Sequence, residues 1–379
     1  MNAALPWLNT RRAEAIETFR VKGVPHRRIE EWKYSDIHSA LTAEDVASAG
    51  SATLKISGAP SNVEIIDLAK LDEAAPQWLR DHLAAADPQG AMNAAAFGYA
   101  TGGVALRVPR NVTASTVHLA VSGRGHARVL IVLEEGASLT LFESHDAATG
   151  LRNIGTDISV AANAQLSHIV IAPTAATAIR IDSIRAKLAR DARYHAHFAD
   201  FGAQLSRTDV HVTLEGQGSE ARLSGVSALA GNVHSDITTE VVHAIGNTHS
   251  TQLFKKAAGG RSRAVYQGRV TVCEGADGVD SQQTAKGILL SPRAEIDLKP
   301  ELIIFADDVK CAHGAAVGDL EAEQIFYLRA RGLPEDEARN LLIRAFLEDA
   351  VLEIADESLR TQVWNAVETA LPATLEDAS

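Results

Sequence analysis

The residues best suited to bind a metal lie close together in one short segment. DDVKCAHGAAVG, residues 307–318, contains Cys311 and, two positions later, His313. Alternate residues of an extended strand point to the same side, so the thiol and the imidazole would be presented together. Iron accepts both thiolate and imidazole ligands. Two ligands do not complete a site, so the pair predicts half of an iron site, with a buried thiol beside a helix-capping histidine as the alternative.

The other histidines and the second cysteine give weaker signals. His195 and His197 would project from one strand face, as in half of a metal site, but no carboxylate or cysteine at matched spacing completes the ligand set. We therefore expect two solvated histidines on the outside of the fold. His168 is expected on an inward face as a hydrogen-bonded core residue, and Cys273 as a small buried core residue.

Composition and missing motifs argue against several classes of protein. The 379 residues carry a formal net charge of -12, which disfavours a surface for nucleic acid or anionic membrane. The sequence has no phosphate-binding loop, dinucleotide-binding fingerprint, zinc-protease motif or serine-hydrolase elbow. It has two cysteines, no apolar signal segment at its beginning and no apolar stretch of membrane-spanning length. These features predict a cytoplasmic protein.

Three regions would position the candidate residues. Residues 1–103 are mostly helical in pattern. From Val104 to residue 318 the apolar residues alternate over short lengths, which predicts β-strands. Over residues 319–379 the helical period returns, with Asp319 as the expected N-cap of the first helix and Gly332 as its end. We expect the two helical regions to cap the open ends of the β region.

A sequence repeat indicates how the strands stack. GASLTLF, NAQLSHI, DARYHAH and SEARLSG align on alanines that lie 27, 28 and 29 residues apart by subtraction: Ala137, Ala164, Ala192 and Ala221. A turn and a strand recurring at this spacing favour the coils of a β-solenoid over a sandwich. The alanines are expected to form one column, and the residues two and four positions after each to face the core. These inward residues are Leu139 and Leu141, Leu166 and His168, Tyr194 and Ala196, and Leu223 and Gly225.

Several long segments resemble a known family. ADDVKCAHGAAVGDLEAEQIFYLRARGLPEDEARNLLIRAF closely resembles the C-terminal signature of the SufB/SufD family of iron–sulfur cluster assembly proteins. The likeness continues upstream through NTHSTQLFKKAAGGRSRAVYQGRVTV and QQTAKGILLSPRAEIDLKPEL, and it is strongest over residues 247–346. Near the beginning, RRIEEWKYSDI resembles the segment typical of the SufD side of the family.

The resemblance implies a fold and a set of partners. The fold would be mainly β: a right-handed parallel β-helix over residues 104–318, flanked by helical domains at 1–103 and 319–379. The function would be that of a SufD-like scaffold subunit, not an enzyme by itself. Its implied partners are a SufB-like subunit and a SufC-like ATPase, which would supply ATP hydrolysis and dock on the C-terminal helices.

The resemblance also implies a site and its cargo. Carried over through the C-x-H-G motif, His313 would lie at the interface with the SufB-like subunit, where the nascent cluster is built, and Cys311 would lie beside it. The cofactor would be a transient iron–sulfur cluster, or iron, shared with that subunit. A flavin is associated with the family's complex, and no residue of this sequence is assigned to it.

The first C-terminal helix has the composition of an interface. EQIFYLRARG places Phe326, Tyr327, Arg329 and Arg331 on one short helix, and aromatic and arginine side chains are typical of binding hot spots. We expect this helix to dock the ATPase partner. The alternative is that Phe326 and Tyr327 only attach the helix to the β region.

Two other functions compete with this interpretation. A polysaccharide-active enzyme of the parallel β-helix class would need clustered charged residues on one face, and RVLIVLEEG, with Glu134 and Glu135, supplies the one nearby acidic pair. A purely structural SufD-like homodimer would have no metal role, and the loss of His313 would then be harmless.

Overall fold

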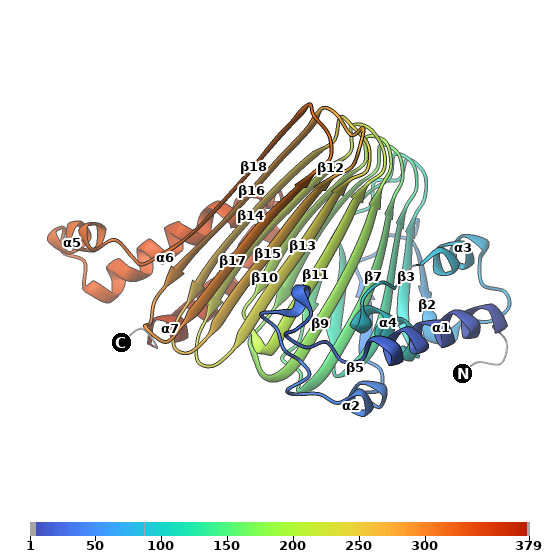
Figure 1. Ribbon diagram of the computed structural model, residues 1–379, viewed down its shortest axis with the longest axis horizontal. Coiled ribbons are helices and arrows are strands. Elements are labelled where there is room, and N and C mark those ends of the chain that lie inside the picture. Colours follow the sequence, from blue (N-terminus) through green and yellow to red (C-terminus); the bar gives the residue numbers. More distant parts are fainter. Residues whose placement is uncertain (1–4, 87, 377–379) are drawn as a thin grey trace.

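The chain winds into a β-helix that carries helices near both of its ends (Figure 1). The computed structural model describes residues 5–86 and 88–376. From β3 on, successive strands alternate between two nine-stranded sheets, one with the strand order β1-β4-β6-β8-β10-β12-β14-β16-β18 and the other with β17-β15-β13-β11-β9-β7-β5-β3-β2. One strand of each sheet, β1 or β2, is antiparallel to its neighbour. The other eight strands of each sheet form eight coils, which confirms the predicted solenoid.

The elements have the following bounds. The α-helices are α1 Pro6–Lys22, α2 Ala43–Ala47, α3 Gln77–Ala85, α4 Ala91–Tyr99, α5 Ala322–Ala330, α6 Glu335–Val351 and α7 Glu357–Glu376, and the short 3-10 helices are η1 Glu30–Trp32 and η2 Leu68–Lys70. The strands of the first sheet are β1 Thr53–Ser57, β4 Val117–Ser122, β6 Ser138–His145, β8 Gln165–Ala172, β10 Arg193–Asp200, β12 Glu220–Leu229, β14 His249–Ala258, β16 Val279–Leu289 and β18 Val309–Gly318. Those of the second sheet are β2 Glu64–Asp67, β3 Gly103–Val108, β5 Gly125–Leu133, β7 Gly150–Val160, β9 Ala175–Leu188, β11 Ala203–Leu214, β13 His234–His243, β15 Arg263–Val272 and β17 Glu295–Ile304.

The sequence repeat reflects a turn that recurs from coil to coil. In each turn the amide of the fourth residue donates to the carbonyl of the first, in the pairs Ala137–Glu134, Ala164–Ala161, Ala192–Ala189 and Ser219–Gly216. The third residue has a φ of 56° to 74° and is Gly136, Asn163, Asp191 or Gly218. These residue types tolerate the left-handed conformation best. The same backbone reversal therefore imposes the same short sequence pattern on each coil.

The predicted column of four alanines is wrong at its last member. The register of β10 and β12 places Ala221 beside Tyr194, so the residue that continues the column after Ala192 is Ser219. Its buried hydroxyl donates to the carbonyl oxygen of Gly216 at 2.6 Å. A serine can replace the alanine because this local hydrogen bond gives its buried hydroxyl a partner. Ala221 lies two residues after Ser219. It faces the same side of the sheet but belongs to the next row, beside Tyr194.

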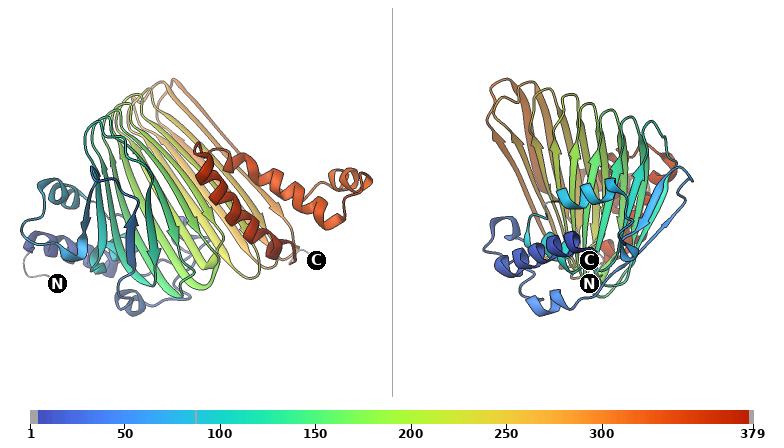
Figure 2. Two further views of the ribbon diagram at one scale, coloured as in Figure 1. Left: turned by 180° about the vertical axis from the view of Figure 1, so that it is seen from behind. Right: turned by 90° about the vertical axis from the view of Figure 1, so that its right-hand side faces the viewer.

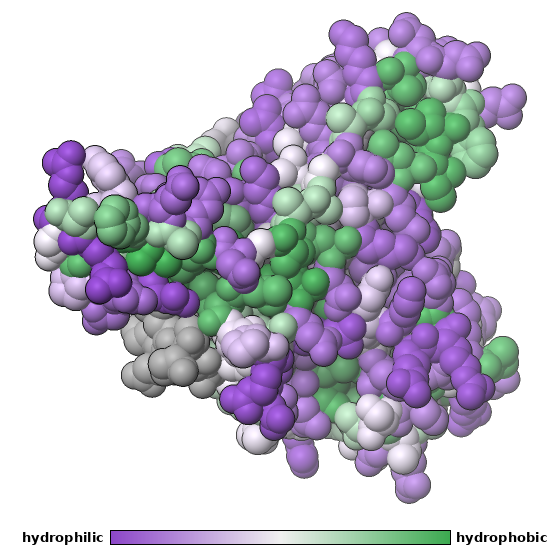
Figure 3. All heavy atoms as spheres, turned by 60° about the vertical axis from the view of Figure 1, so that its left-hand side comes forward, coloured by the Kyte–Doolittle hydropathy of each residue, from purple (hydrophilic) through white to green (hydrophobic). Residues whose placement is uncertain are grey.

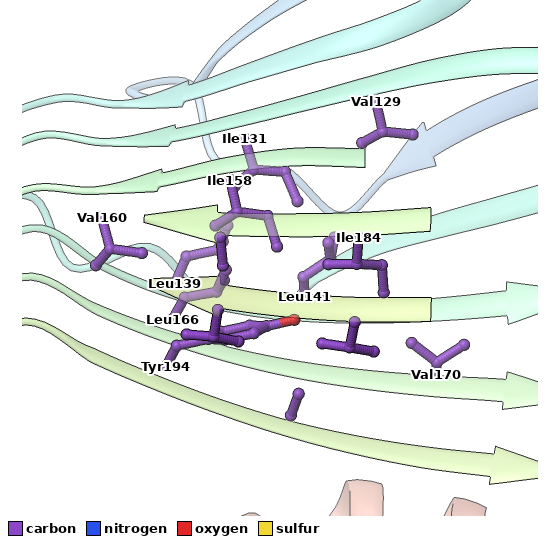
Figure 4. Packing of buried hydrophobic residues seen from close by; sticks show 14 of the residues in the cluster. Val129, Ile131, Leu139, Leu141, Ile158, Val160, Leu166, Val170, Ile184 and Tyr194 are labelled. Atoms are coloured by element: carbon purple, nitrogen blue, oxygen red, sulfur yellow. The ribbon is translucent and has the colours of Figure 1, made fainter. Parts of the chain in front are cut away.

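The interior of the first coils is an apolar core (Figure 4). One row of inward residues runs through Leu139, Leu166, Tyr194 and Ala221, and the next through Leu141, His168, Ala196 and Leu223. Both rows are buried. The inward assignment of the predicted residues is thus confirmed, with the last coil shifted by two positions. Valine and isoleucine from the second sheet, including Val129, Ile131 and Ile184, close the core from the other side.

The two ends of the β-helix differ. The prediction that helices cap both ends is wrong. At the first coil, β1 pairs with β4 and β2 pairs with β3, both antiparallel, so added strands cover that end. At the last coil, β17 and β18 are the outermost strands of their sheets. The C-terminal helices instead pack on the outer face of the first sheet, where α6 contacts β12 and β14 and α7 contacts β8, β10 and β12 (Figure 2). The last coil therefore presents two open sheet edges.

The C-terminal helices differ in how they are attached. α6 and α7 share an apolar cluster with outward residues of the first sheet, such as Ile169 and Val226. Lys255 on β14 reaches α6, where its Nζ lies 2.9 Å from a carboxylate oxygen of Asp349. α5 packs on α6 and extends away from the β-helix (Figures 1 and 2). Its N-cap is Glu321, two residues after the predicted Asp319.

The N-terminal helices cover the outer face of the second sheet. α4 packs on β5, β7 and β9, and α1 packs on α4. Of the helices in the described part of the chain, none is long and apolar enough to cross a membrane. The division into domains at residues 103 and 318 remains a prediction.

Candidate functional site

Cys311 and His313 lie on β18, the outermost strand of the first sheet. β18 pairs with β16, and the register places Cys311 beside Ser281 and His313 beside Gln283. Cys311 is half-buried and His313 is exposed. Both continue rows of residues that face the interior in the preceding coils, and no following coil covers them. The structure thus confirms that the two side chains share one face, and it places them at the open end.

The interior becomes polar toward this end. The row that ends at Cys311 is Leu139, Leu166, Tyr194, Ala221, Ser250, Ser281 and Cys311. The row that ends at His313 is Leu141, His168, Ala196, Leu223, Gln252, Gln283 and His313. Hydroxyl and amide side chains therefore replace leucine behind the candidate pair. These residues were not among the predicted site residues, and their successive spacings of 30 and 31 residues, by subtraction, exceed the 27 to 29 of the sequence repeat.

The thiol of Cys311 lies at the edge of an apolar cluster. It packs against a group of buried residues that includes Val270, Val272 and Val279. Partial burial, with the nearby carboxylate of Asp280, raises the pKa of the thiol above its ordinary value. The thiol is therefore protonated at neutral pH in the chain by itself, as expected for a cysteine without a metal or a cationic neighbour.

The structure disfavours a helix-capping role for His313. α5 begins at Ala322, nine residues after His313, and the side chain of its N-cap, Glu321, makes no capping hydrogen bond. A Cβ atom built on Gly314, the residue after His313, would meet open space. The chain's own packing therefore does not account for an exposed imidazole followed by glycine.

The chain does not provide a complete set of metal ligands. No group of three or more histidine, cysteine, aspartate or glutamate side chains within residues 5–86 and 88–376 is arranged to hold a metal ion. Cys311 and His313 can supply two donors on one side of an ion, and the remaining donors would have to come from another molecule.

The other candidate ligands have local roles. His168 is buried, with Nε2 3.1 Å from Oε2 of Glu143 and Nδ1 3.1 Å from the hydroxyl of Tyr194, so its prediction as a bonded core residue is confirmed. His195 is partly exposed, but His197 is buried and lies 2.9 Å from the hydroxyl of Ser224. The prediction of two solvated histidines is wrong for His197 because α7 packs on this face of β10.

Cys273 is not the core residue that the sequence predicted. It is partly exposed and follows the end of β15, where its carbonyl accepts a hydrogen bond from the amide of Ala276. It thus occupies the first position of the recurring turn. A strand pattern cannot predict its orientation there because the alternation of faces ends with the strand.

Two of the four predicted docking residues, Phe326 and Tyr327, line an apolar groove. The groove has a volume of about 920 Å³ and lies along α5 and α6, bordered by Phe326, Tyr327 and Leu341. Phe326 is 74% exposed and Tyr327 is 58% exposed, so these rings do not attach α5 to the β-helix. Figure 3 brings the side of the molecule with α5 and α6 forward, and it shows apolar patches among polar side chains.

The two predicted arginines make different contacts, and neither is among the residues that line the groove. Arg331 lies over the ring of Tyr327, with its guanidinium carbon 5.2 Å from the ring centroid. Arg329 pairs with Glu335, with 2.9 Å between Nη1 and Oε2. Arg331 therefore places positive charge beside one exposed ring, a combination common at binding hot spots, whereas the charge of Arg329 is already paired with Glu335.

The acidic pair of the enzyme alternative does not form a catalytic site. Glu134 and Glu135 lie in a turn, where Glu134 pairs with Arg107 at 3.1 Å and Glu135 with Arg110 at 2.9 Å. These are partly exposed structural ion pairs at the coil edge.

Comparisons with known proteins match this chain to one family. Residues 118–346 match the family described as SUF system FeS cluster assembly, SufBD core domain, and residues 1–49 match the SufBD protein N-terminal region. The chain is 29% identical to the iron–sulfur cluster assembly protein SufD of Escherichia coli, over 92% of this chain and 90% of that protein. It is 27% identical to an iron–sulfur cluster assembly SufBD family protein of Synechocystis, over 91% and 87% of the two chains. It is 25% identical to SufD of Bacillus subtilis, over 70% and 64%.

Proposed function

Because this chain belongs to the SufBD family of iron–sulfur cluster assembly proteins, we propose that it is the SufD-like scaffold subunit of a SUF complex. Its partners would be a SufB-like subunit and a SufC-like ATPase. The observation that carries the proposal is the placement of Cys311 and His313 on the outermost strand at the open end of the β-helix. A site with two donors on an uncovered edge fits assembly with a second protein.

The open end is suited to a β-helical partner. The edges of β17 and β18 have backbone groups free to pair with another strand, and such edges are otherwise covered in stable proteins. Exposed apolar side chains accompany them, including Phe305, which is 64% exposed in the turn between β17 and β18, and Val317. A SufB-like subunit that extends both sheets would bury these side chains.

The cluster would be built as cargo at that interface. The exposed imidazole of His313 would bind iron, and the thiol of Cys311 would be a second donor once a metal ion displaces its proton. Ligands of the SufB-like subunit would complete the coordination. This division agrees with the incomplete ligand set of the described chain.

ATP hydrolysis would belong to the partner that docks on α5 and α6. The groove bordered by Phe326 and Tyr327, with Arg329 and Arg331 beside it, would receive the SufC-like ATPase. Since α6 also packs on β12 and β14, movement of the ATPase would be transmitted to the β-helix through α6. The chain itself would be a non-catalytic scaffold, a flavin would have no assigned site on it, and a cytoplasmic location remains a prediction.

The open-end interface is tested by adding a charge to it. In Phe305→Glu, the new carboxylate would be buried against the partner, so we expect the variant to lose co-purification with the SufB-like subunit. Its melting temperature should match that of the wild type because Phe305 is exposed. Val21→Glu is the matched control, since Val21 is an exposed apolar residue on α1.

Full recovery of the partner by Phe305→Glu would place the interface elsewhere. A self-associating chain that recovers no SufB-like partner would favour the alternative, a structural homodimer.

A further inference from the structure

A buried glutamine lies directly behind His313. Gln283 on β16 is paired with His313 in the register, and the two residues face the same way, so their side chains are one strand spacing apart, about 4.8 Å. Gln283 is 1% exposed. It is therefore the last buried residue of the interior row that ends at the exposed imidazole.

A chain of hydrogen bonds fixes the orientation of the Gln283 amide. Its Nε2 donates to the hydroxyl of Tyr266 at 3.0 Å, and that hydroxyl donates to Oε1 of Gln252 at 3.0 Å. Thr239 donates to the same Oε1 at 2.6 Å. The hydroxyl of Tyr266 has one proton, which it gives to Gln252, so it must accept from Gln283. The nitrogen of the Gln283 amide thus faces Tyr266, and the oxygen of the same amide points away from Tyr266.

Space for this amide depends on a glycine in the opposite sheet. A Cβ atom built on Gly268 of β15 would clash with Nε2 of Gln283 and with the hydroxyl oxygen of Tyr266. Any larger residue at this position would displace both groups. The Gln283 side chain therefore occupies a space that exists because residue 268 is glycine.

The amide oxygen of Gln283 has no hydrogen-bond partner. Oε1 is buried and unpaired within the described part of the chain. A buried acceptor without a donor destabilises the folded state. The next side chain in the row is the exposed His313, whose imidazole carries an N–H group in its neutral form.

We propose that Gln283 is a positioning residue for His313: its Oε1 accepts the hydrogen bond of one ring N–H. This bond fixes the tautomer and orientation of the imidazole, so that the lone pair of the other ring nitrogen is directed out of the open end toward iron. Metal-binding histidines are generally held in this way by an acceptor behind the ring. The inference rests on the proposed role of His313.

The tautomer of His313 tests the proposal without a metal. In the full chain labelled with 15N-histidine, ring 15N shifts are measured at a pH where the imidazole is neutral, and His313→Ala identifies the signal. We expect one dominant tautomer in the wild type and a mixture of both in Gln283→Leu. Gln282→Leu, which changes the exposed neighbour on β16, should resemble the wild type. A wild-type mixture, or the same tautomer in Gln283→Leu, overturns the proposal.

Cluster content tests the same residue in the complex. Gln283→Leu should lower the cluster content of the complex with the SufB-like and SufC-like proteins at least about tenfold, and Gln283→Glu, which keeps an acceptor oxygen, should restore most of it. Unchanged content in Gln283→Leu, or no rescue by Gln283→Glu, overturns the positioning role. Failure of the proposed function has a different signature, because His313→Ala itself would then assemble clusters normally.

Discussion

At the residue scale, three histidines, two of them buried and one partly buried, link the stability of the fold to pH. Burial lowers the pKa of His197 to about 3 and the pKa values of His234 and His243 to about 4. Above the unfolded pKa of about 6.5, both the folded and unfolded states are neutral, and these groups do not affect stability. Below it, the unfolded state binds protons that the folded state does not. The free energy of unfolding then falls by about 1.4 kcal/mol per pH unit for each histidine.

This linkage predicts the behaviour of a His197 variant. His197→Gln removes the titrating ring while keeping a polar group near Ser224. Between pH 7 and pH 5, we expect its free energy of unfolding to fall by about 2 kcal/mol less than that of the wild type. Urea unfolding at the two pH values measures the difference. An equal loss in both proteins would show that His197 is protonated in the folded state.

At the element scale, the predicted ATPase-docking surface can be tested without disturbing the β-helix. Deletion of all residues after Gly318 is unsuitable, because α6 and α7 cover apolar residues on the outer face of the first sheet. The double substitution Phe326→Ala and Tyr327→Ala removes exposed rings only. We expect at least about a 30-fold weaker affinity for the SufC-like ATPase, as for the loss of about 2 kcal/mol at a hot spot.

The control is an exposed apolar residue of the same helical region outside the groove. Leu352→Ala, next to the end of α6, should bind the ATPase like the wild type and melt at a similar temperature. Undiminished affinity of the double variant would show that the groove along α5 and α6 is not the docking site.

The elements also show what the sequence could and could not predict. The solenoid, its inward rows and the shared face of Cys311 and His313 follow from a period of two and a repeated turn, which are local properties. The predicted alanine column failed at Ser219, because a serine at this turn position can form a hydrogen bond within the turn. The burial of His197 could not be predicted, because it depends on where distant helices pack. Gln283 required the register of β16 and β18, which no single segment encodes.

At the scale of the whole molecule, the sheet edges of the β-helix are covered by added strands at one end only. Antiparallel strands cover the first coil, whereas the last coil has open edges, exposed apolar residues and the candidate pair. The interior also changes from leucine to serine and glutamine along the same direction. All three features lie at the last coil, where we propose that another protein binds.

The most direct test of the central claim is the iron and sulfide content of the purified complex with the SufB-like and SufC-like proteins. With His313→Ala, we predict that the complex forms normally and contains at least about tenfold less cluster than the wild type. Cys311→Ala should have a smaller effect, since the thiol packs in an apolar cluster that alanine preserves in part. A His313→Ala complex with wild-type cluster content would contradict the account.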